Sequence, residues 1–148
     1  MKARELMTKE PEVLTEDDTV QRAAQRMREL DVGLMPVVDD ASSRRLRGVI
    51  TDRDIATRHV AEGHDTGECR VGNEMTKDNL YTVTADDDTN VVMERMKAGQ
   101  VRRVPVMEGD RIIGIIAQAD LAVETSDAAA EEVERTVEKI SEPAEPER

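Results

Sequence analysis

Hydrophobic and polar positions along the chain follow first a helical and then a strand-like period. Between Val20 and Leu30 the apolar residues recur at helical spacing, and they are Val20, Ala23, Ala24, Met27 and Leu30. Apolar runs typical of strands follow at residues 34–38 and 46–51. The pattern therefore predicts an amphipathic helix followed by two strands.

The same pattern occurs twice, which indicates an internal duplication. The second copy has its apolar helix positions and strand-like runs at Val92, Met93, Met96, 104–107 and 111–116. The helix and first strand match their counterparts at a shift of 69 positions, and the segment from Gly48 matches that from Gly114 at a shift of 66. Two copies are too few for a solenoid, so we expect each half to bury the apolar face of the other.

Polar residues indicate where the predicted helices begin. Thr15 and Thr84, each followed by acidic residues, supply side-chain oxygens and negative charge that suit a helix N-terminus. A further helix follows the second strand of each half, and it opens at Asp54 and Asp120. The predicted order in each half is strand, helix, strand, strand, helix. Because Pro36 and Pro105 lack a backbone donor, we expect their strands to lie at a sheet edge or to begin there.

These elements divide the chain into two repeats and two further segments. The predicted segments are repeat one at 1–63, a connector at 64–73, repeat two at 74–124 and an acidic C-terminal segment at 125–148. In the last segment Val133, Val137 and Ile140 share a helical face, which predicts a docked helix. Pro143 and Pro146 end that helix, and we expect the last residues to be disordered.

Composition excludes several classes of partner. The chain has 148 residues and a formal net charge of −12, a field that repels nucleic acid and anionic membranes. Aromatic residues are 1%, too few for the stacking that single-stranded nucleic-acid readers use. The apolar runs are too short to span a membrane. With one cysteine and a charged N-terminus, we expect a cytoplasmic protein without a secretory signal.

The ordered motifs resemble the CBS domain family. They are Met-Thr near the start of each half, Thr-x-Asp-Asp before a helix, the Pro-Val strand and the closing segment Gly48 to Asp54. Two copies in tandem resemble a CBS pair, or Bateman module, of the short stand-alone kind found in bacteria and archaea, which includes the hypoxic-response type. The resemblance covers about residues 3 to 124.

This resemblance implies an α/β fold and a regulatory function. Each half is then a β-α-β-β-α unit, and the two pack through their sheets and form two clefts. In many family members these clefts bind AMP, ADP, ATP, NAD or S-adenosylmethionine as a regulatory ligand. The resemblance also implies a homodimer that signals to an unknown regulated protein, with no enzymatic activity and no required cofactor. A structural or interaction dimer without a ligand is the alternative.

Thr51 and Asp54 are the main candidates in the first cleft. The start of the predicted helix offers free N–H groups to a phosphate, the Thr51 hydroxyl can donate to the same phosphate, and the Asp54 carboxylate can accept two ribose hydroxyls. By resemblance Thr51 contacts the phosphate and Asp54 the ribose. The alternative is that Thr51 only caps a helix.

Two arginines of the second half complete the expected phosphate site. By resemblance Arg102 and Arg103 reach across to Thr51 and Asp54, where each could form charge-assisted bonds. The alternative is a surface ion pair in a chain rich in acids. The second cleft has Asp120 for a ribose but Ala117 in place of the threonine, so we expect it to be empty or to hold an uncharged adenosine moiety.

The adenine base needs an apolar slot beside these polar groups. The candidates around the Asp54 cleft are Val13, Met35, Pro36 and Val49. The alternative is that these residues belong to the ordinary core.

His59, His64 and Cys69 are the only histidines and the only cysteine of the chain, and they lie close together in sequence. Zinc prefers such nitrogen and sulfur ligands, and an acid such as Asp65 or Glu68 could complete the set. The spacing fits no standard zinc finger, so we expect no metal, and three solvent-exposed linker residues are the simpler interpretation. A metal-responsive protein is a third functional hypothesis.

Overall fold

The computed structural model describes residues 1–123 and residue 140. The chain divides into two compact units. The repeat-1 unit consists of Glu12–Leu80 and Asp110–Ile112, and the described part of the repeat-2 unit consists of Met1–Pro11, Tyr81–Gly109, 113–123 and Ile140. The starts of the two sequence repeats are therefore exchanged: residues 1–11 pack with repeat two, and residues 74–80 pack with repeat one.

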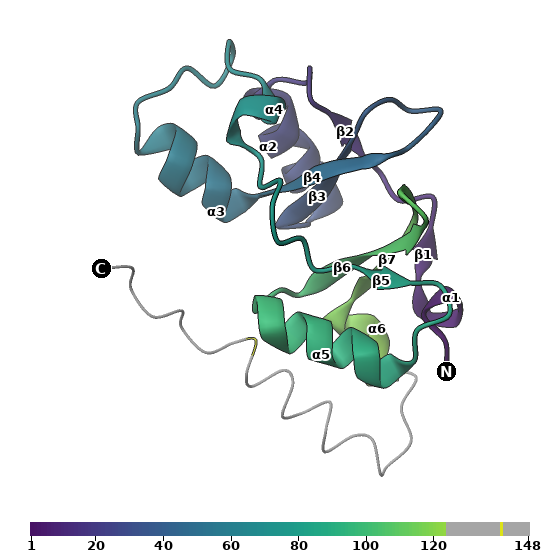
Figure 1. Ribbon diagram of the computed structural model, residues 1–148. Helices are drawn as coiled ribbons and strands as arrows, with labels where there is room; N and C mark the ends of the chain where they lie inside the picture. Colours follow the sequence, from purple (N-terminus) through teal and green to yellow (C-terminus); the bar gives the residue numbers. More distant parts are fainter. Residues whose placement is uncertain (124–139, 141–148) are drawn as a thin grey trace. The chain divides into compact units, whose positions relative to one another are not determined.

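The repeat-1 unit is built around a three-stranded sheet (Figure 1). Its elements are β2 (Leu14–Thr15), α2 (Val20–Leu30), β3 (Leu34–Val38), β4 (Leu46–Thr51), α3 (Asp52–Asp54), the π-helix η1 (Ile55–Val60) and α4 (Val71–Glu74). The sheet order is β2-β3-β4, in which β2 is parallel and β4 antiparallel to β3. The predicted helix at 20–30 and both predicted strands are confirmed.

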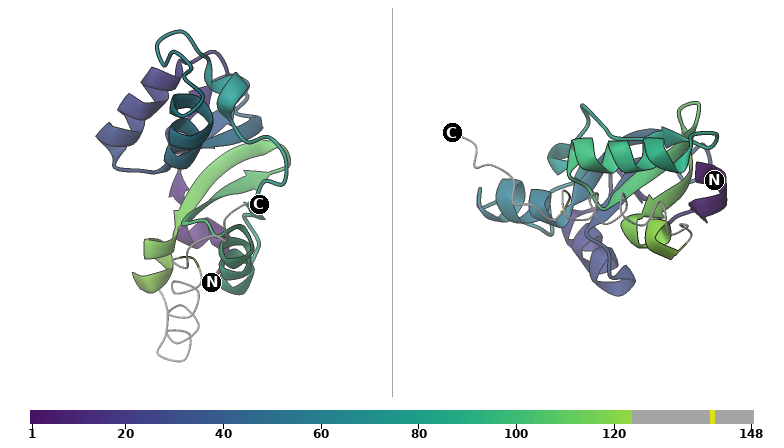
Figure 2. Two further views of the ribbon diagram at one scale, coloured as in Figure 1. Left: turned by 90° about the vertical axis from the view of Figure 1, so that its left-hand side faces the viewer. Right: turned by 90° about the horizontal axis from the view of Figure 1, so that it is seen from below.

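The repeat-2 unit has the same order of elements and an added N-terminal strand. Its elements are α1 (Ala3–Leu6), β1 (Thr8–Lys9), β5 (Val83–Thr84), α5 (Thr89–Gly99), β6 (Arg103–Glu108), β7 (Arg111–Ala117) and α6 (Gln118–Val123). The sheet order is β1-β7-β6-β5, and helix α5 packs against this sheet (Figure 2). The first two residues of β7 belong to the repeat-1 unit. The α/β class and the β-α-β-β-α order of each half are confirmed.

The apolar periodicity identifies the buried face of α2 only in part. Val20, Ala23 and Met27 are buried, whereas Ala24 and Leu30 are exposed. In the repeat-2 unit Val92, Met93 and Met96 are buried in a core with strands β6 and β7. Ile140 is also buried in this core. The expectations for Val133, Val137, Pro143 and Pro146 fall outside the described residues.

The expectation that Thr15 caps the start of α2 was wrong. Thr15 lies in β2, and its backbone N–H donates to Asp18 Oδ2 at 2.8 Å. The cap of α2 is Thr19, whose hydroxyl accepts from Arg22 N at 3.0 Å. Thr84 repeats the arrangement of Thr15, with its N–H on Asp87 Oδ2 at 2.8 Å. The motif Thr-x-x-Asp therefore forms a turn that joins strand to helix.

The two proline-containing strands are central, not at a sheet edge as the sequence led us to expect. β3 lies between β2 and β4, and β6 lies between β7 and β5. The short neighbours explain how proline is tolerated. β2 pairs only with Val37 and Val38, so the ladder on that side begins after Pro36. Pro105 has the same relation to β5, which pairs with Val106 and Met107.

Gly48 allows the segment after α4 to approach strand β4 closely. Thr76 and Val49 exchange backbone hydrogen bonds of 3.0 and 2.8 Å, and a Cβ on Gly48 would lie 2.5 Å from the Thr76 carbonyl oxygen. We expect Gly48→Ala to lower the free energy of unfolding by about 1–3 kcal/mol, because backbone must move to relieve the overlap. Denaturant unfolding measures this. Gly67→Ala, whose Cβ would meet nothing nearer than 3.4 Å, serves as the control, and equal midpoints for the two variants would contradict the expectation.

Candidate functional site

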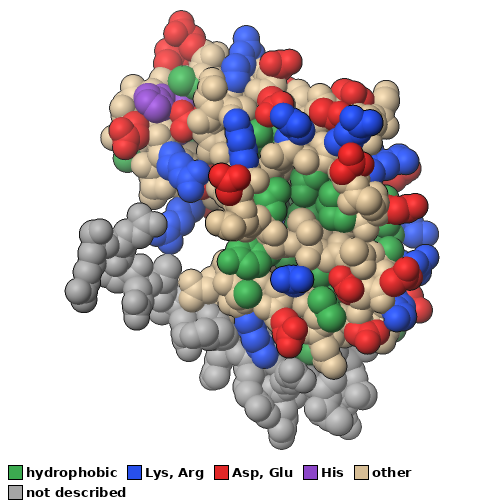
Figure 3. All heavy atoms as spheres, in the orientation of Figure 1, with side chains coloured by type: hydrophobic (Ala, Val, Ile, Leu, Met, Phe, Trp, Pro, Cys, Tyr) green, Lys and Arg blue, Asp and Glu red, His purple; other side chains and the backbone are tan. Residues whose placement is uncertain are grey.

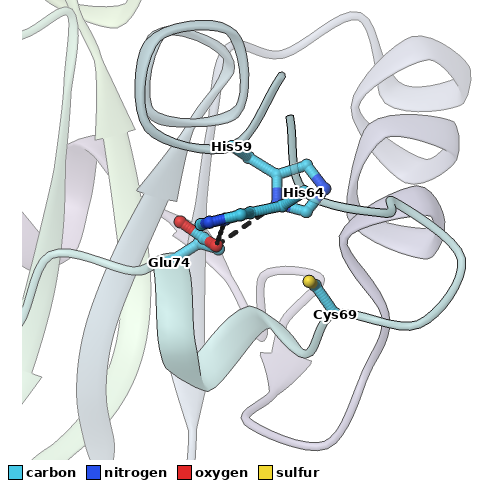
Figure 4. A group of neighbouring side chains, drawn as sticks. All are labelled: His59, His64, Cys69 and Glu74. Atoms are coloured by element: carbon cyan, nitrogen blue, oxygen red, sulfur yellow. Dashed lines mark hydrogen bonds and ion pairs between the residues drawn. The ribbon is translucent and has the colours of Figure 1, made fainter. Parts of the chain in front are cut away.

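Four potential metal ligands converge in the repeat-1 unit. His59, His64, Cys69 and Glu74 each offer one ligand atom, and these atoms lie within 4.8 Å of one another. Figure 4 shows that the four side chains point toward a common centre. Among the residues that the structure describes, this is the group of histidine, cysteine and acidic side chains that could hold a metal ion.

Three adjacent elements position the cluster. His59 lies in the last turn of η1, Glu74 is the last residue of α4, and the loop between them carries His64 and Cys69. A π-helix is rare and is often found at functional sites. The loop is held by backbone hydrogen bonds, from His64 N to His59 O at 3.1 Å and from Cys69 N to Asp65 O at 2.9 Å.

The Glu74 carboxylate joins the two histidines. Its Oε1 lies 3.3 Å from His59 Nδ1 and 2.7 Å from His64 Nδ1. His59 is 0% and Glu74 7% exposed, whereas 46% of the His64 side chain is exposed. Figure 3 shows histidine at the molecular surface. Burial raises the pKa of Glu74, but the hydrogen bonds from His64 and His59 outweigh it and leave the pKa below its usual value. The ionised carboxylate is the form that binds metal.

The donor set fits a zinc ion. Two imidazole nitrogens, one sulfur and one carboxylate oxygen make the four ligands of a closed tetrahedral site. At zinc–ligand distances of about 2.0–2.3 Å, neighbouring ligand atoms of a tetrahedron are roughly 3.3–3.8 Å apart, so small side-chain movements would bring this group into place. His59 Nε2 is buried and has no hydrogen-bond partner in the described structure, which is consistent with an imidazole that binds a metal ion.

Two expectations about this region were wrong. His59 is not an exposed linker residue, because it belongs to η1 and is fully buried. The acid near the histidines is Glu74, not Asp65 or Glu68. The Asp65 carboxylate instead accepts a hydrogen bond from Gly67 N at 2.8 Å within the loop. A signal was present in the sequence, since His59, His64, Cys69 and Glu74 follow one another at every fifth position.

Thr51 and Asp54 form a reciprocal cap at the start of α3. Thr51 Oγ1 accepts from Asp54 N at 3.0 Å, and Asp54 Oδ2 accepts from Thr51 N at 3.0 Å. Asp54 is 8% exposed. The hydroxyl of Thr76 lies 3.4 Å from Asp54 Oδ2, and Arg58 Nε lies 3.7 Å from Oδ1. Thr51 therefore caps the helix, as the alternative interpretation expected. The Asp54 carboxylate also has two polar neighbours, Thr76 and Arg58, that the sequence did not predict.

The predicted base-slot residues differ in burial. Met35 is 1% exposed and belongs to the core of the repeat-1 unit, as the alternative interpretation had it. Pro36 is buried, and Val13 and Val49 are half-buried. Strand pairing places Pro36 opposite Val49. Pro36, Val49 and Val13 therefore remain predicted contacts for the adenine base.

The remaining predicted residues belong to the repeat-2 unit. Asp120 Oδ2 accepts from Ala117 N at 2.8 Å, the counterpart of the Asp54 bond. Arg102 is exposed and Arg103 half-buried, and neither forms an ion pair with a described residue. Thr51 and these arginines lie in different compact units, so their approach to a common phosphate stays a prediction.

No helix in the described part of the chain combines the length and apolar character that crossing a membrane requires.

Comparison with known proteins identifies a family. The CBS domain family matches residues 3–60 and 71–126. Hypoxic response protein 1 of Mycobacterium tuberculosis is 38% identical over 120 residues, which cover 81% of this chain and 82% of the relative. The crystal structure of Hypoxic Response Protein I with two coordinated zinc ions has a TM-score of 0.78 and 35% identity, and the match covers 85% of this chain and 100% of that one.

A more distant structure shares the fold alone. It is the CBS domain pair of protein MJ0100 in complex with 5′-methylthioadenosine and S-adenosyl-L-methionine. The TM-score is 0.70 at 23% identity, and the match covers 83% of this chain and 98% of the other.

Proposed function

The chain belongs to the CBS domain family and contains two CBS domains in tandem, and we propose that it is a regulatory protein in which His59, His64, Cys69 and Glu74 hold a zinc ion. One observation carries the proposal: side chains from η1, the following loop and α4 bring four ligand atoms within 4.8 Å. The zinc ions of a relative that is 35% identical support it.

The ligand set favours a structural or regulatory ion over a catalytic one. Catalytic zinc sites keep one position open for water or substrate, whereas structural sites are closed by four protein ligands. Here two of the four ligands, His59 and Glu74, are buried. Zinc supplies Lewis acidity when it is bound, but in a closed site its main effect is to hold the ligands together.

The site would fix the loop between η1 and α4, which is hydrogen-bonded to the start of α2. Val20 N donates to Cys69 O at 3.0 Å and Gln21 N donates to Thr66 O at 2.9 Å, so the loop carries backbone acceptors for the start of α2. An ion that holds Cys69 and His64 against η1 therefore also stabilises this helix start. Because binding requires the folded arrangement of ligands, zinc should raise the stability of the domain.

Titration with zinc tests the proposal. Chelator-treated chain is mixed with zinc in competition with a chromophoric chelator, and thermal unfolding is recorded with and without the ion. We expect one tight site per chain and a higher melting temperature with zinc. No competition with the chelator, in protein that is folded and has Cys69 reduced, would refute the zinc site.

An adenosine-type ligand is the second candidate function, and the geometry at Asp54 favours it. The carboxylate belongs to α3, directly after β4, and has Thr51, Thr76 and Arg58 around it. Arg102 and Arg103 are without ion pairs in the described structure, as a phosphate site would need. The CBS pair that holds S-adenosyl-L-methionine supports only the capacity of the fold.

Such a ligand would act through a partner. It would shift the protein toward the arrangement that it binds better, and a regulated protein would recognise that arrangement. We expect AMP, ATP, NAD or S-adenosylmethionine to act in this way on a homodimer. Light scattering tests the dimer. A dimer whose melting temperature no nucleotide changes would favour the ligand-free interaction protein instead.

A further inference from the structure

We propose that Cys69 is a site of oxidative modification, at which hydrogen peroxide oxidises the sulfur and thereby releases the metal ion. This inference rests on the proposed zinc function and adds a means of regulating it. It follows from the chemistry of the four ligands, from their unequal burial and from the cysteine content of the chain.

Only one of the four ligands is readily oxidised by peroxide. A thiolate is a nucleophile toward peroxide, whereas imidazole and carboxylate groups are comparatively inert. Cys69 is also within reach of small solutes, because it is half-buried in a largely exposed loop, while His59 and Glu74 are buried. The oxidisable ligand therefore lies on the open side of the cluster.

The reaction balances with peroxide as the oxidant. The Cys69 thiolate attacks one peroxide oxygen, the O–O bond breaks, an S–O bond forms, and hydroxide leaves. Sulfur loses two electrons and the peroxide gains them, so that a sulfenic acid remains. The sulfenic acid is a poorer ligand than the thiolate, which leaves His59, His64 and Glu74 as an incomplete set.

The cysteine content determines how the modification is reversed. Cys69 is the one cysteine of the 148-residue chain, so no second thiol of the same chain can condense with the sulfenic acid. An external thiol must do so: it forms a mixed disulfide with Cys69 and releases water, and a second thiol then displaces the Cys69 thiolate. Recovery of the site therefore requires a soluble thiol.

The experiment uses the full zinc-loaded chain and hydrogen peroxide. Released zinc is followed with a chromophoric chelator, and peptide mass analysis follows the addition of one oxygen atom at Cys69. We expect zinc release and Cys69 oxidation to proceed together, and a dithiol followed by fresh zinc to restore the site. Cys69→Asp and Cys69→His replace the thiol with ligands that zinc accepts but peroxide does not oxidise. We expect whichever variant binds zinc to keep it under peroxide.

The outcomes separate this inference from the zinc proposal itself. A chain that never binds zinc overturns both. Zinc that stays bound at a peroxide concentration sufficient to oxidise Cys69 in the metal-free chain overturns the inference alone. Release of zinc from the cysteine-free variants at the wild-type rate also overturns it, because oxidation of the eight methionines would then be the cause.

Discussion

Replacing Glu74 with glutamine will abolish tight zinc binding. The Glu74 carboxylate is buried, and its Oε1 contacts His59 Nδ1 at 3.3 Å and His64 Nδ1 at 2.7 Å. Glutamine has nearly the same shape but lacks the negative charge that a metal ligand or its orienting partner supplies. Even carboxylates that only orient a zinc-bound histidine are worth about 10–100-fold in metal affinity, so we expect a loss of roughly 100-fold or more. Calorimetric titration of chelator-treated protein measures it.

A matched variant separates this effect from a general change of charge. Glu68→Gln removes one acid from the exposed loop between His64 and Cys69, outside the cluster of ligands. We expect it to bind zinc as the wild type does. Circular dichroism shows whether both metal-free variants keep their helices. Wild-type zinc affinity in folded Glu74→Gln would remove Glu74 from the site.

Replacing Asp54 with alanine will remove most of the binding of an adenosine-type ligand. The proposal assigns the Asp54 carboxylate to the two ribose hydroxyls, and hydrogen bonds to a charged group contribute about 1.5–3 kcal/mol each. Two such bonds correspond to a loss on the order of 100-fold or more in affinity. Calorimetry with AMP, ATP, NAD and S-adenosylmethionine, on chain freed of bound small molecules, measures the change.

Asp120→Ala is the matched control for Asp54→Ala. Both carboxylates accept a backbone N–H from the residue three positions earlier, at 3.0 Å from Thr51 and at 2.8 Å from Ala117. Both variants therefore lose an equivalent capping bond, which costs about 0.5–2 kcal/mol. Asp54→Ala loses in addition the contacts with Thr76 and Arg58. We expect Asp120→Ala to bind ligand more nearly as the wild type does. Equal losses in the two variants, or no heat from any of the four compounds with wild-type protein, would contradict the proposed role of Asp54.

Elements with a long regular period were predictable from the sequence. Helix α2 begins at Val20 and ends at Leu30 as expected, because its apolar positions repeat over three turns. Its capping residue was missed for a local reason: Thr15 and Thr19 are both good caps, and only the turn made by Asp18 decides between them. The strands of Pro36 and Pro105 were placed at an edge because sequence does not reveal that a neighbouring strand is only two residues long.

The candidate metal centre was predictable in composition but not in geometry. His59, His64 and Cys69 were noticed because they are rare in this chain. Their convergence depends on a π-helix that places His59 on the buried side and on a short helix that brings Glu74 beside it, and neither follows from hydrophobic periodicity. With 33 acidic residues, composition could not single out Glu74.

Metal analysis of the freshly purified full chain, combined with X-ray absorption at the zinc edge, tests the zinc centre most directly. The account predicts about one zinc ion per chain, surrounded by nitrogen and oxygen ligands and a single sulfur, the complement that His59, His64, Cys69 and Glu74 provide. Folded protein that carries no zinc and takes up none while Cys69 is reduced, or bound zinc without a sulfur ligand, would contradict it.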